Sequence, residues 1–185
     1  MMKTKKWGLV LVACMVFLVG CNSNVSARTD AKLNGTWVAL TIPDETMRIV
    51  ENSYRRAGIT GFQLMQIMEE AEATMLRVEM RKNNGNFELV VDDISNARGT
   101  FTTNGGKLTT RTTHMHGGPI GLESRWYTID ELRRTLIDMN IPVNLVNAMF
   151  STLALEEIPS EYSVTENTLT TTHPVGGQTI YTRRR

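Results

Sequence analysis

The sequence has no cysteine after residue 21 and no apolar stretch that reads as a membrane-spanning helix. Its two cysteines, Cys14 and Cys21, both lie near the N-terminus, so the rest of the 185-residue chain has none with which to form a disulfide. The apolar run from Leu9 to Val19 is shorter than the roughly 20 residues that a spanning helix needs. We therefore expect the folded part to be stabilised by packing and by strand pairing.

Catalytic signatures are also missing. The sequence has no nucleophile elbow, no phosphate-binding loop and no spacing typical of a catalytic triad. Its paired carboxylates, such as Asp92-Asp93 and Glu156-Glu157, are adjacent, and adjacent residues of a strand point to opposite faces. We see no acid–base couple in them, and we expect the protein not to be an enzyme.

The N-terminal segment has the pattern of a secretory signal. Three lysines within the first six residues precede the short apolar run, so we interpret residues 1–20 as a signal peptide that is removed. Removal takes three of the 20 Lys and Arg residues and leaves 17 basic against 19 acidic residues, a net charge of −2. That balance gives no indication of nucleic-acid binding.

The end of this run resembles the lipobox of bacterial lipoproteins. Leu18-Val19-Gly20-Cys21 has the apolar residue, the tolerated or small residues and the cysteine in the required order. The resemblance implies that the Cys21 sulfur carries a lipid and that the protein is exported and anchored in the bacterial cell envelope. Asn22, where Asp would favour the inner membrane, favours the outer membrane if the host has one.

The remaining chain divides into a tether and one domain. Residues 21–32 are polar and without periodicity, as in a flexible tether. Residues 33–185 alternate strand and helix patterns. Eight strands are predicted to start near residues 35, 75, 86, 99, 107, 161, 168 and 178. Helical pairs are predicted within 43–73 and 128–155, the second of these pairs ending in a helix over 142–153. Both insertions follow odd-numbered strands, so in a meander we expect them at the same end.

The first strand carries a resemblance to the lipocalins. Gly35-Thr36-Trp37 is similar to their Gly-X-Trp signature, and in that family an arginine after the last strand packs on the tryptophan. The resemblance implies an eight-stranded antiparallel up-and-down β-barrel, mainly β with α insertions, in which the first strand pairs with the last. Arg183 is the arginine that we expect beside Trp37. The alternative is an unrelated β-rich fold in which Trp37 is a core aromatic.

Two kinds of side chain suggest a ligand inside such a barrel. Threonines alternate along two strands and would line its interior if that face points inward, and methionines on the helices can adapt to apolar ligands. The residues expected to contact a small, largely apolar ligand are Met47, Met65, Met68, Thr110, Thr112, Met149 and Thr171. The alternatives are that these threonines serve β-propensity and that these methionines pack the core.

The three histidines suggest a metal site. His114 and His116 are two residues apart on one predicted strand, and His173 lies on another, so the three would share a face if both strands are regular. Three histidine nitrogens and an open position suit zinc. The alternative is that these histidines lie at the surface or are bonded within the protein.

Three functions remain open at this point. The leading hypothesis is an envelope lipoprotein with a lipocalin-like barrel that binds a small, largely apolar ligand. The second is a structural or partner-binding lipoprotein with a filled barrel, whose protein partner is unknown. The third is a lipoprotein that binds a divalent metal.

Overall fold

The structure is a computed structural model that describes residues 30–184 apart from 40–41, 73–75, 82–84 and 92–93. The predicted signal peptide, 1–20, and the predicted acylation site, Cys21, lie outside these residues. Residues 30–32 of the predicted tether, 21–32, are described. The Asp30 backbone N–H donates to the Thr103 hydroxyl, and Leu33, in the 3₁₀ helix η2 (Ala31–Leu33), is fully buried.

The chain forms nine strands and four α-helices within the described residues. The strands are β1 (Gly35–Ala39), β2 (Leu76–Arg81), β3 (Asn86–Val91), β4 (Ile94–Asn104), β5 (Lys107–His116), β6 (Trp126–Thr128), β7 (Ser160–Val164), β8 (Thr168–His173) and β9 (Gly177–Arg184). The helices are α2 (Asp44–Arg56), α3 (Gly61–Glu72), α4 (Ile129–Asp138) and α5 (Val143–Met149), with short 3₁₀ helices η3 (Gly118–Ile120) and η4 (Ser151–Glu157).

The strands form one mainly antiparallel sheet in the order β4-β3-β2-β1-β9-β8-β7-β5-β6, and β4 also pairs with β5. The first strand pairs with the last, as predicted: Thr36 lies opposite Arg184, and Trp37 lies opposite Arg183. The contact between β5 and β7 is short, because only Lys107 and Leu108 are paired with β7.

Three elements differ from the predictions. The fourth strand begins at Ile94 and not near residue 99. One strand, β6, was not among the eight predicted strands. It lies in a stretch without a clear sequence pattern and pairs with the end of β5. The predicted helix over 142–153 is wrong in length, since α5 ends at Met149 and η4 continues the chain as a 3₁₀ helix.

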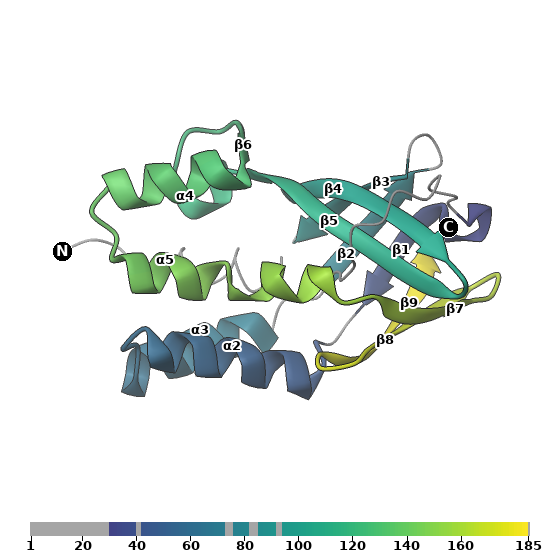
Figure 1. Cartoon of the computed structure of the whole chain (residues 1–185), viewed down its shortest axis with the longest axis horizontal. Coiled ribbons are helices and arrows are strands. Elements are labelled where there is room, and N and C mark those ends of the chain that lie inside the picture. Colours follow the sequence, from purple (N-terminus) through teal and green to yellow (C-terminus); the bar gives the residue numbers. More distant parts are fainter. Residues whose placement is uncertain (1–29, 40–41, 73–75, 82–84, 92–93, 185) are drawn as a thin grey trace.

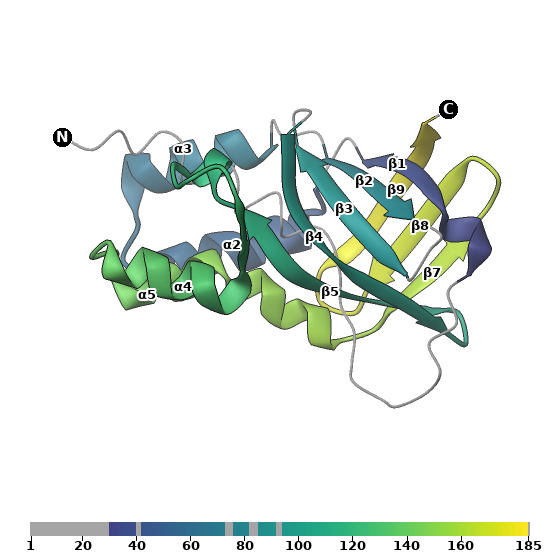
Figure 2. The same ribbon diagram turned by 90° about the horizontal axis from the view of Figure 1, so that it is seen from above.

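The four α-helices gather at one end of the sheet, as predicted for the two insertions (Figure 1). Helix α2 contacts both α3 and α5, and α5 contacts α4. Figure 2, seen from above, shows the same separation of helices from strands. We call this the helical end. None of the helices in the described part of the chain is long and apolar enough to span a membrane.

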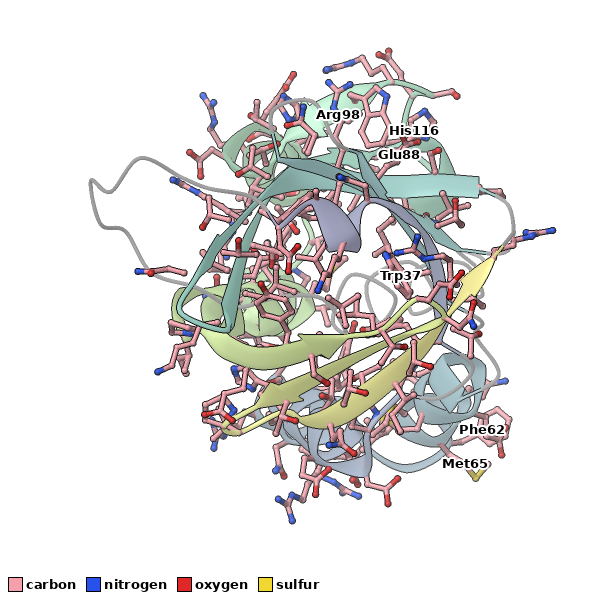
Figure 3. All side chains as sticks on the ribbon, turned by 90° about the vertical axis from the view of Figure 1, so that its right-hand side faces the viewer. Trp37, Phe62, Met65, Glu88, Arg98 and His116 are labelled. Atoms are coloured by element: carbon pink, nitrogen blue, oxygen red, sulfur yellow. The ribbon has the colours of Figure 1, made fainter. Side chains whose placement is uncertain are left out.

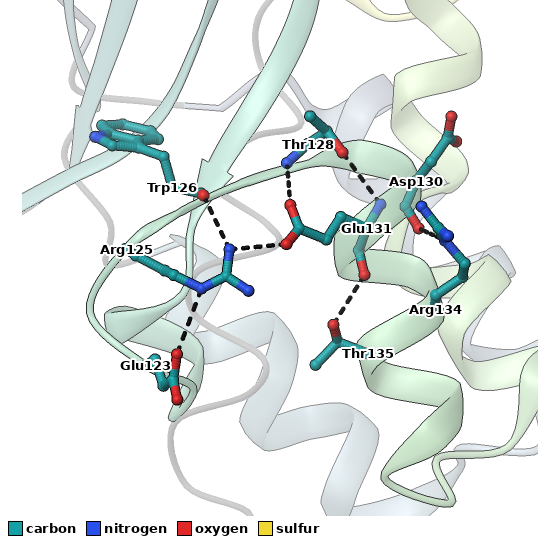
Figure 4. A network of polar contacts seen from close by, with 8 residues as sticks. All are labelled: Glu123, Arg125, Trp126, Thr128, Asp130, Glu131, Arg134 and Thr135. Carbon is teal, nitrogen blue, oxygen red and sulfur yellow. Dashed lines mark hydrogen bonds and ion pairs between the residues drawn. The ribbon is translucent and has the colours of Figure 1, made fainter.

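Helix α4 begins with the predicted capping box. The Thr128 hydroxyl accepts from the Glu131 backbone N–H, and the Glu131 carboxylate accepts from the Thr128 backbone N–H, so two amides that the helix leaves free are bonded. Arg125 Nη1 donates to the Glu131 carboxylate over 2.8 Å (Figure 4). This network sets the direction in which α4 leaves β6.

The opposite end of the sheet is organised around Trp37. Its side chain is fully buried, and its indole N–H donates to the Leu33 carbonyl over 2.7 Å. The Arg183 guanidinium lies 4.5 Å from the centre of the indole ring, so the predicted contact is confirmed. Arg183 also donates to the Lys32 carbonyl over 2.6 Å. We call this the Trp37 end.

Candidate functional site

The inner face of β5 carries the first part of the candidate site. Leu108, Thr110 and Thr112 are buried at alternate positions, while Lys107 and Arg111 between and beside them are exposed. Thr110 and Thr112 therefore lie on the buried face of β5, and their contact with a ligand stays a prediction. A strand places every second side chain on one face, so two hydroxyls stand next to an apolar core residue.

On β8 and β9 the same face is also rich in hydroxyls. Thr171 lies two residues from the buried Leu169 and pairs with Thr179, which is buried. Tyr181, fully buried, lies two residues beyond Thr179, and hydrogen bonds from Thr179 and Thr171 offset part of the rise that burial causes in the pKa of the Tyr181 phenol. The polar lining predicted for Thr171 thus extends to two residues that the sequence did not single out.

A bulge in β5 overturns the prediction for two of the histidines. Arg98 pairs with His114 but Gly99 pairs with Thr112, so Thr113 is an extra residue in the ladder. A Cβ on Gly99 would collide with the Arg111 carbonyl oxygen, which shows how closely the strands approach there. After the bulge Met115, and not His114, takes the inward position and is fully buried.

The outer face beyond the bulge holds a small cluster. His116 lies edge-on to the Trp126 ring, with 5.3 Å between ring centres, and the Arg98 guanidinium lies 4.5 Å from the centre of the same ring. Figure 3 shows His116 and Arg98 together on this side of the sheet. His114 shares the face, and its pKa is lowered by burial and by the charge of Arg98.

His173 lies elsewhere, where β8 turns into β9. Its Nδ1 accepts the backbone N–H groups of Val175 and Gly176, the latter over 2.6 Å. Burial lowers its pKa, and a backbone hydrogen bond to Leu155 offsets part of that effect. The predicted grouping of His114, His116 and His173 is therefore not formed. Among the described residues no three His, Cys, Asp or Glu side chains are placed to hold a metal.

The structure adds a residue that sequence reasoning missed, the buried Glu156 on η4. A 3₁₀ helix repeats every three residues, so Phe150 and Glu156, both buried, are turned to the same side. The Glu156 carboxyl accepts from the Thr112 backbone N–H and from the Thr112 hydroxyl, each over 2.6 Å. The carboxyl thus bonds the Thr112 backbone N–H of β5, which lies beyond the residues of β5 that pair with β7.

Glu156 is an unusual carboxyl because it is 6% exposed. Burial raises its pKa from the usual 4.5 to about 8, although the two bonds from Thr112 and the charge of Arg111 act in the opposite direction. At pH 7, below this pKa, the carboxyl is therefore mostly protonated.

Thr110 is the residue whose surroundings are least explained by folding. Its side chain is fully buried, and its hydroxyl has no hydrogen-bond partner among the described residues. A buried polar group without a partner costs about 1–3 kcal/mol. Thr110 lies two residues from Thr112 on the same face, so this hydroxyl stands beside the Thr112–Glu156 pair.

The predicted methionines divide into two groups. Met47 on α2 and Met149 on α5 are buried, and Met68 on α3 is partly buried against the core. Met65 is 48% exposed and lies on the outside of α3 with the more exposed Phe62 (Figure 3). The prediction that Met65 contacts a ligand inside the protein is therefore wrong for this structure.

Comparisons with known proteins add little. No protein-family model and no curated protein matches the sequence. One similar solved structure is described as a DUF4847 family protein from Bacteroides vulgatus. The two are 12% identical, the alignment covers 84% of this chain and 95% of that chain, and the TM-score is 0.39. A likeness at this level carries no argument about function.

Proposed function

We propose that the protein is an exported, lipid-anchored protein of the bacterial cell envelope whose sheet forms a lipocalin-like barrel that binds a small, largely apolar ligand. The observation that carries the ligand is the Thr110 hydroxyl, which is fully buried on the inner face of β5 and has no partner among the described residues. A bound molecule with one polar atom would supply the missing hydrogen bond.

The strand pairings support the barrel. β1 pairs with β9, β4 pairs with β5, and β5 pairs with β7. Together with the other pairings in the sheet, each of the eight predicted strands therefore pairs with the next one along the chain, and the last pairs with the first. A barrel of eight strands has an interior that side chains just fill or that holds one small ligand.

The two ends of the proposed barrel also agree with the lipocalin resemblance. The packing of Arg183 on Trp37 has the same pair of residue types at the same place in the strand order. The helices at the other end bring Met47 and Met149, which are buried, and Met68, which is partly buried. Flexible thioethers suit an apolar ligand of variable shape.

The lipid anchor can be tested apart from the ligand. We expect wild-type protein to be recovered with membranes and to incorporate labelled palmitate, and we expect Cys21→Ser to lose both. A Cys14→Ser variant is the matched control, since Cys14 lies inside the predicted signal peptide. Equal labelling of the Cys21→Ser variant and the wild type would overturn the anchor.

Native mass spectrometry tests the ligand. Protein purified from its own membrane is expected to carry a small molecule that organic extraction removes, beyond the mass of the lipidated chain. A preparation that retains no such molecule and takes up none of a panel of C10 to C16 amphiphiles would overturn ligand binding.

A second function, binding to a protein partner, is favoured by one observation. Phe62 on α3 is 66% exposed and lies beside Met65, which is 48% exposed. Neighbouring exposed apolar side chains mark contact surfaces more often than isolated ones do. Crosslinking in cells from a photoreactive residue at position 62 would identify such a partner, and crosslinking from position 180, where Ile180 is 57% exposed on β9, is the control. Equal yields at both positions would argue against a specific surface on α3.

A further inference from the structure

The buried polar side chains of the described residues include one acid and no base. Besides the polar atoms of the buried tryptophan and tyrosine residues, they comprise one carboxyl, four threonine hydroxyls, one serine hydroxyl and one amide, on Glu156, Thr46, Thr110, Thr112, Thr179, Ser160 and Asn96. None of them is Lys or Arg. Arg183, which is half-buried, is engaged by the Trp37 ring and by the Lys32 carbonyl. Among the described residues, the buried side chains therefore offer an incoming molecule hydroxyls, one amide and one acid, but no Lys or Arg.

An anionic head group is disfavoured in such a place. A carboxylate that moves from water into the interior loses its hydration and needs a positive partner or several donors to replace it. Beside Thr110 it would instead stand near the Glu156 carboxyl, which Thr112 holds in position by two bonds of 2.6 Å. That carboxyl is mostly protonated at pH 7, so it supplies no positive partner that would offset the lost hydration of a carboxylate.

A cationic head group fits little better. Both Glu156 oxygens already accept a hydrogen bond from Thr112, so an ammonium group would find only their remaining lone pairs. An ammonium group carries three donors, and the Thr110 hydroxyl can accept from one of them. Burying the positive charge of an ammonium group also costs more than burying an uncharged group, because its hydration is lost.

A hydroxyl group matches what Thr110 lacks. The threonine hydroxyl is one donor with two acceptor positions, and an alcohol has the same inventory, so each can donate to or accept from the other. Neither group carries a charge that must be desolvated. The apolar neighbours of Thr110 on the inner face, Leu108 on one side and Met115 beyond the bulge, suit an alkyl chain.

We propose that the protein selects an uncharged, hydroxyl-bearing amphiphile, such as a long-chain alcohol, through the Thr110 hydroxyl, and that a carboxylate of the same chain length is disfavoured because the described buried side chains offer it no positive partner. This inference rests on the proposed function, because it names the class of ligand for the same interior. It makes Thr110 the residue that recognises the head group.

Three ten-carbon probes test the inference at pH 7: 1-decanol, decanoate and decylamine. Each is added to the full chain in detergent micelles, and bound probe is counted by native mass spectrometry after release from the micelle. We expect 1-decanol to bind at least about tenfold more tightly than decanoate or decylamine, since one unmatched buried polar group is worth about that factor. Thr110→Val should weaken 1-decanol binding by about tenfold.

The matched control is Thr109→Val, which makes the same change at the neighbouring, half-exposed position of β5. It should leave all three affinities unchanged. Thermal unfolding of the unliganded variants supplies a second measurement. Because Thr110→Val removes a buried hydroxyl that has no partner, it should not lower the unfolding temperature.

The outcomes separate the inference from the function on which it rests. If all probes bind equally, or if Thr110→Val binds 1-decanol as the wild type does, the selection for hydroxyl fails while ligand binding stands. A fall in the unfolding temperature for Thr110→Val in the absence of ligand would show that the hydroxyl serves the fold, and would also overturn the inference. If the wild type binds none of the probes, the proposed ligand binding fails with it.

Discussion

The Trp37 end and the helical end of the sheet bury their side chains in opposite ways. At the Trp37 end a large aromatic ring is packed against apolar residues and has its only polar atom bonded to the Leu33 carbonyl. Toward the helical end the same inner face holds the Thr110 hydroxyl without a partner and the buried Glu156 carboxyl. The first arrangement maximises stability. The second accepts a cost, as binding sites commonly do.

The largest effect is expected at the Trp37 end. Trp37→Ala removes a fully buried indole from the core, so the free energy of unfolding should fall by about 3–5 kcal/mol in urea titrations. Val38→Ala, at the next position of β1 with a half-buried side chain, is the control and should cost much less. Equal losses in the two variants would show that this end is not the stable part of the molecule.

The second effect concerns pH at the helical end. Because the folded state raises the pKa of Glu156 to about 8 from 4.5, the folded protein holds a proton that the unfolded chain releases, and stability falls as pH rises between these values. The fall from pH 6.5 to pH 8 should be about 2 kcal/mol. His114 and His173 have lowered pKa values, so they titrate below their usual 6.5 and reduce stability only at lower pH.

Glu156→Gln provides the control for that measurement. The amide oxygen can still accept the Thr112 backbone N–H, but it does not titrate, so the free energy of unfolding should stay level from pH 6.5 to pH 8. The same slope in the variant as in the wild type would place the titrating group elsewhere.

A smaller effect is expected for the cation above Trp37. Arg183→Ala removes the contact with the indole ring and the bond to the Lys32 carbonyl, and it should lower the free energy of unfolding by about 1–2 kcal/mol. Arg184→Ala, at the exposed next position, should have little effect. If Arg183→Lys preserves stability fully, charge alone and not the planar guanidinium accounts for the contact.

The smallest effect is expected at the surface of the helical end. Thr128→Ala removes one half of the capping box of α4 and should cost about 1 kcal/mol in urea unfolding. Thr135→Ala is the control, because that hydroxyl bonds back to the Glu131 carbonyl within the helix and contributes no cap. A loss in the cap variant as large as that of Trp37→Ala would contradict the division between the two ends.

Periodicity and turn residues were sufficient to predict most of the fold. Alternation in β5 placed Thr110 and Thr112 on one face, Thr128 and Glu131 predicted the start of α4, the barrel resemblance predicted the pairing of β1 with β9, and strand parity predicted the common end of the helices. These features depend on local side-chain chemistry or on counting, which a single sequence contains.

The parts of the site that escaped prediction depend on irregularities. The extra residue at Thr113 reverses which face His114 takes, and nothing in a run of threonines marks where a bulge falls. The change from α5 to the 3₁₀ helix η4 turns Glu156 inward, whereas the sequence shows only two adjacent acids. Burial of such a carboxyl is decided by the neighbouring strand and not by its own segment.

The pairing of β1 with β9 has a consequence for how the molecule is made. It joins Thr36 to Arg184, nearly the full length of the described chain apart, so its loop can close only after the last strand has been synthesised. Contacts between such distant segments slow folding. The export proposed for this protein would gain from this order, because the sheet stays incomplete until β9 has been synthesised.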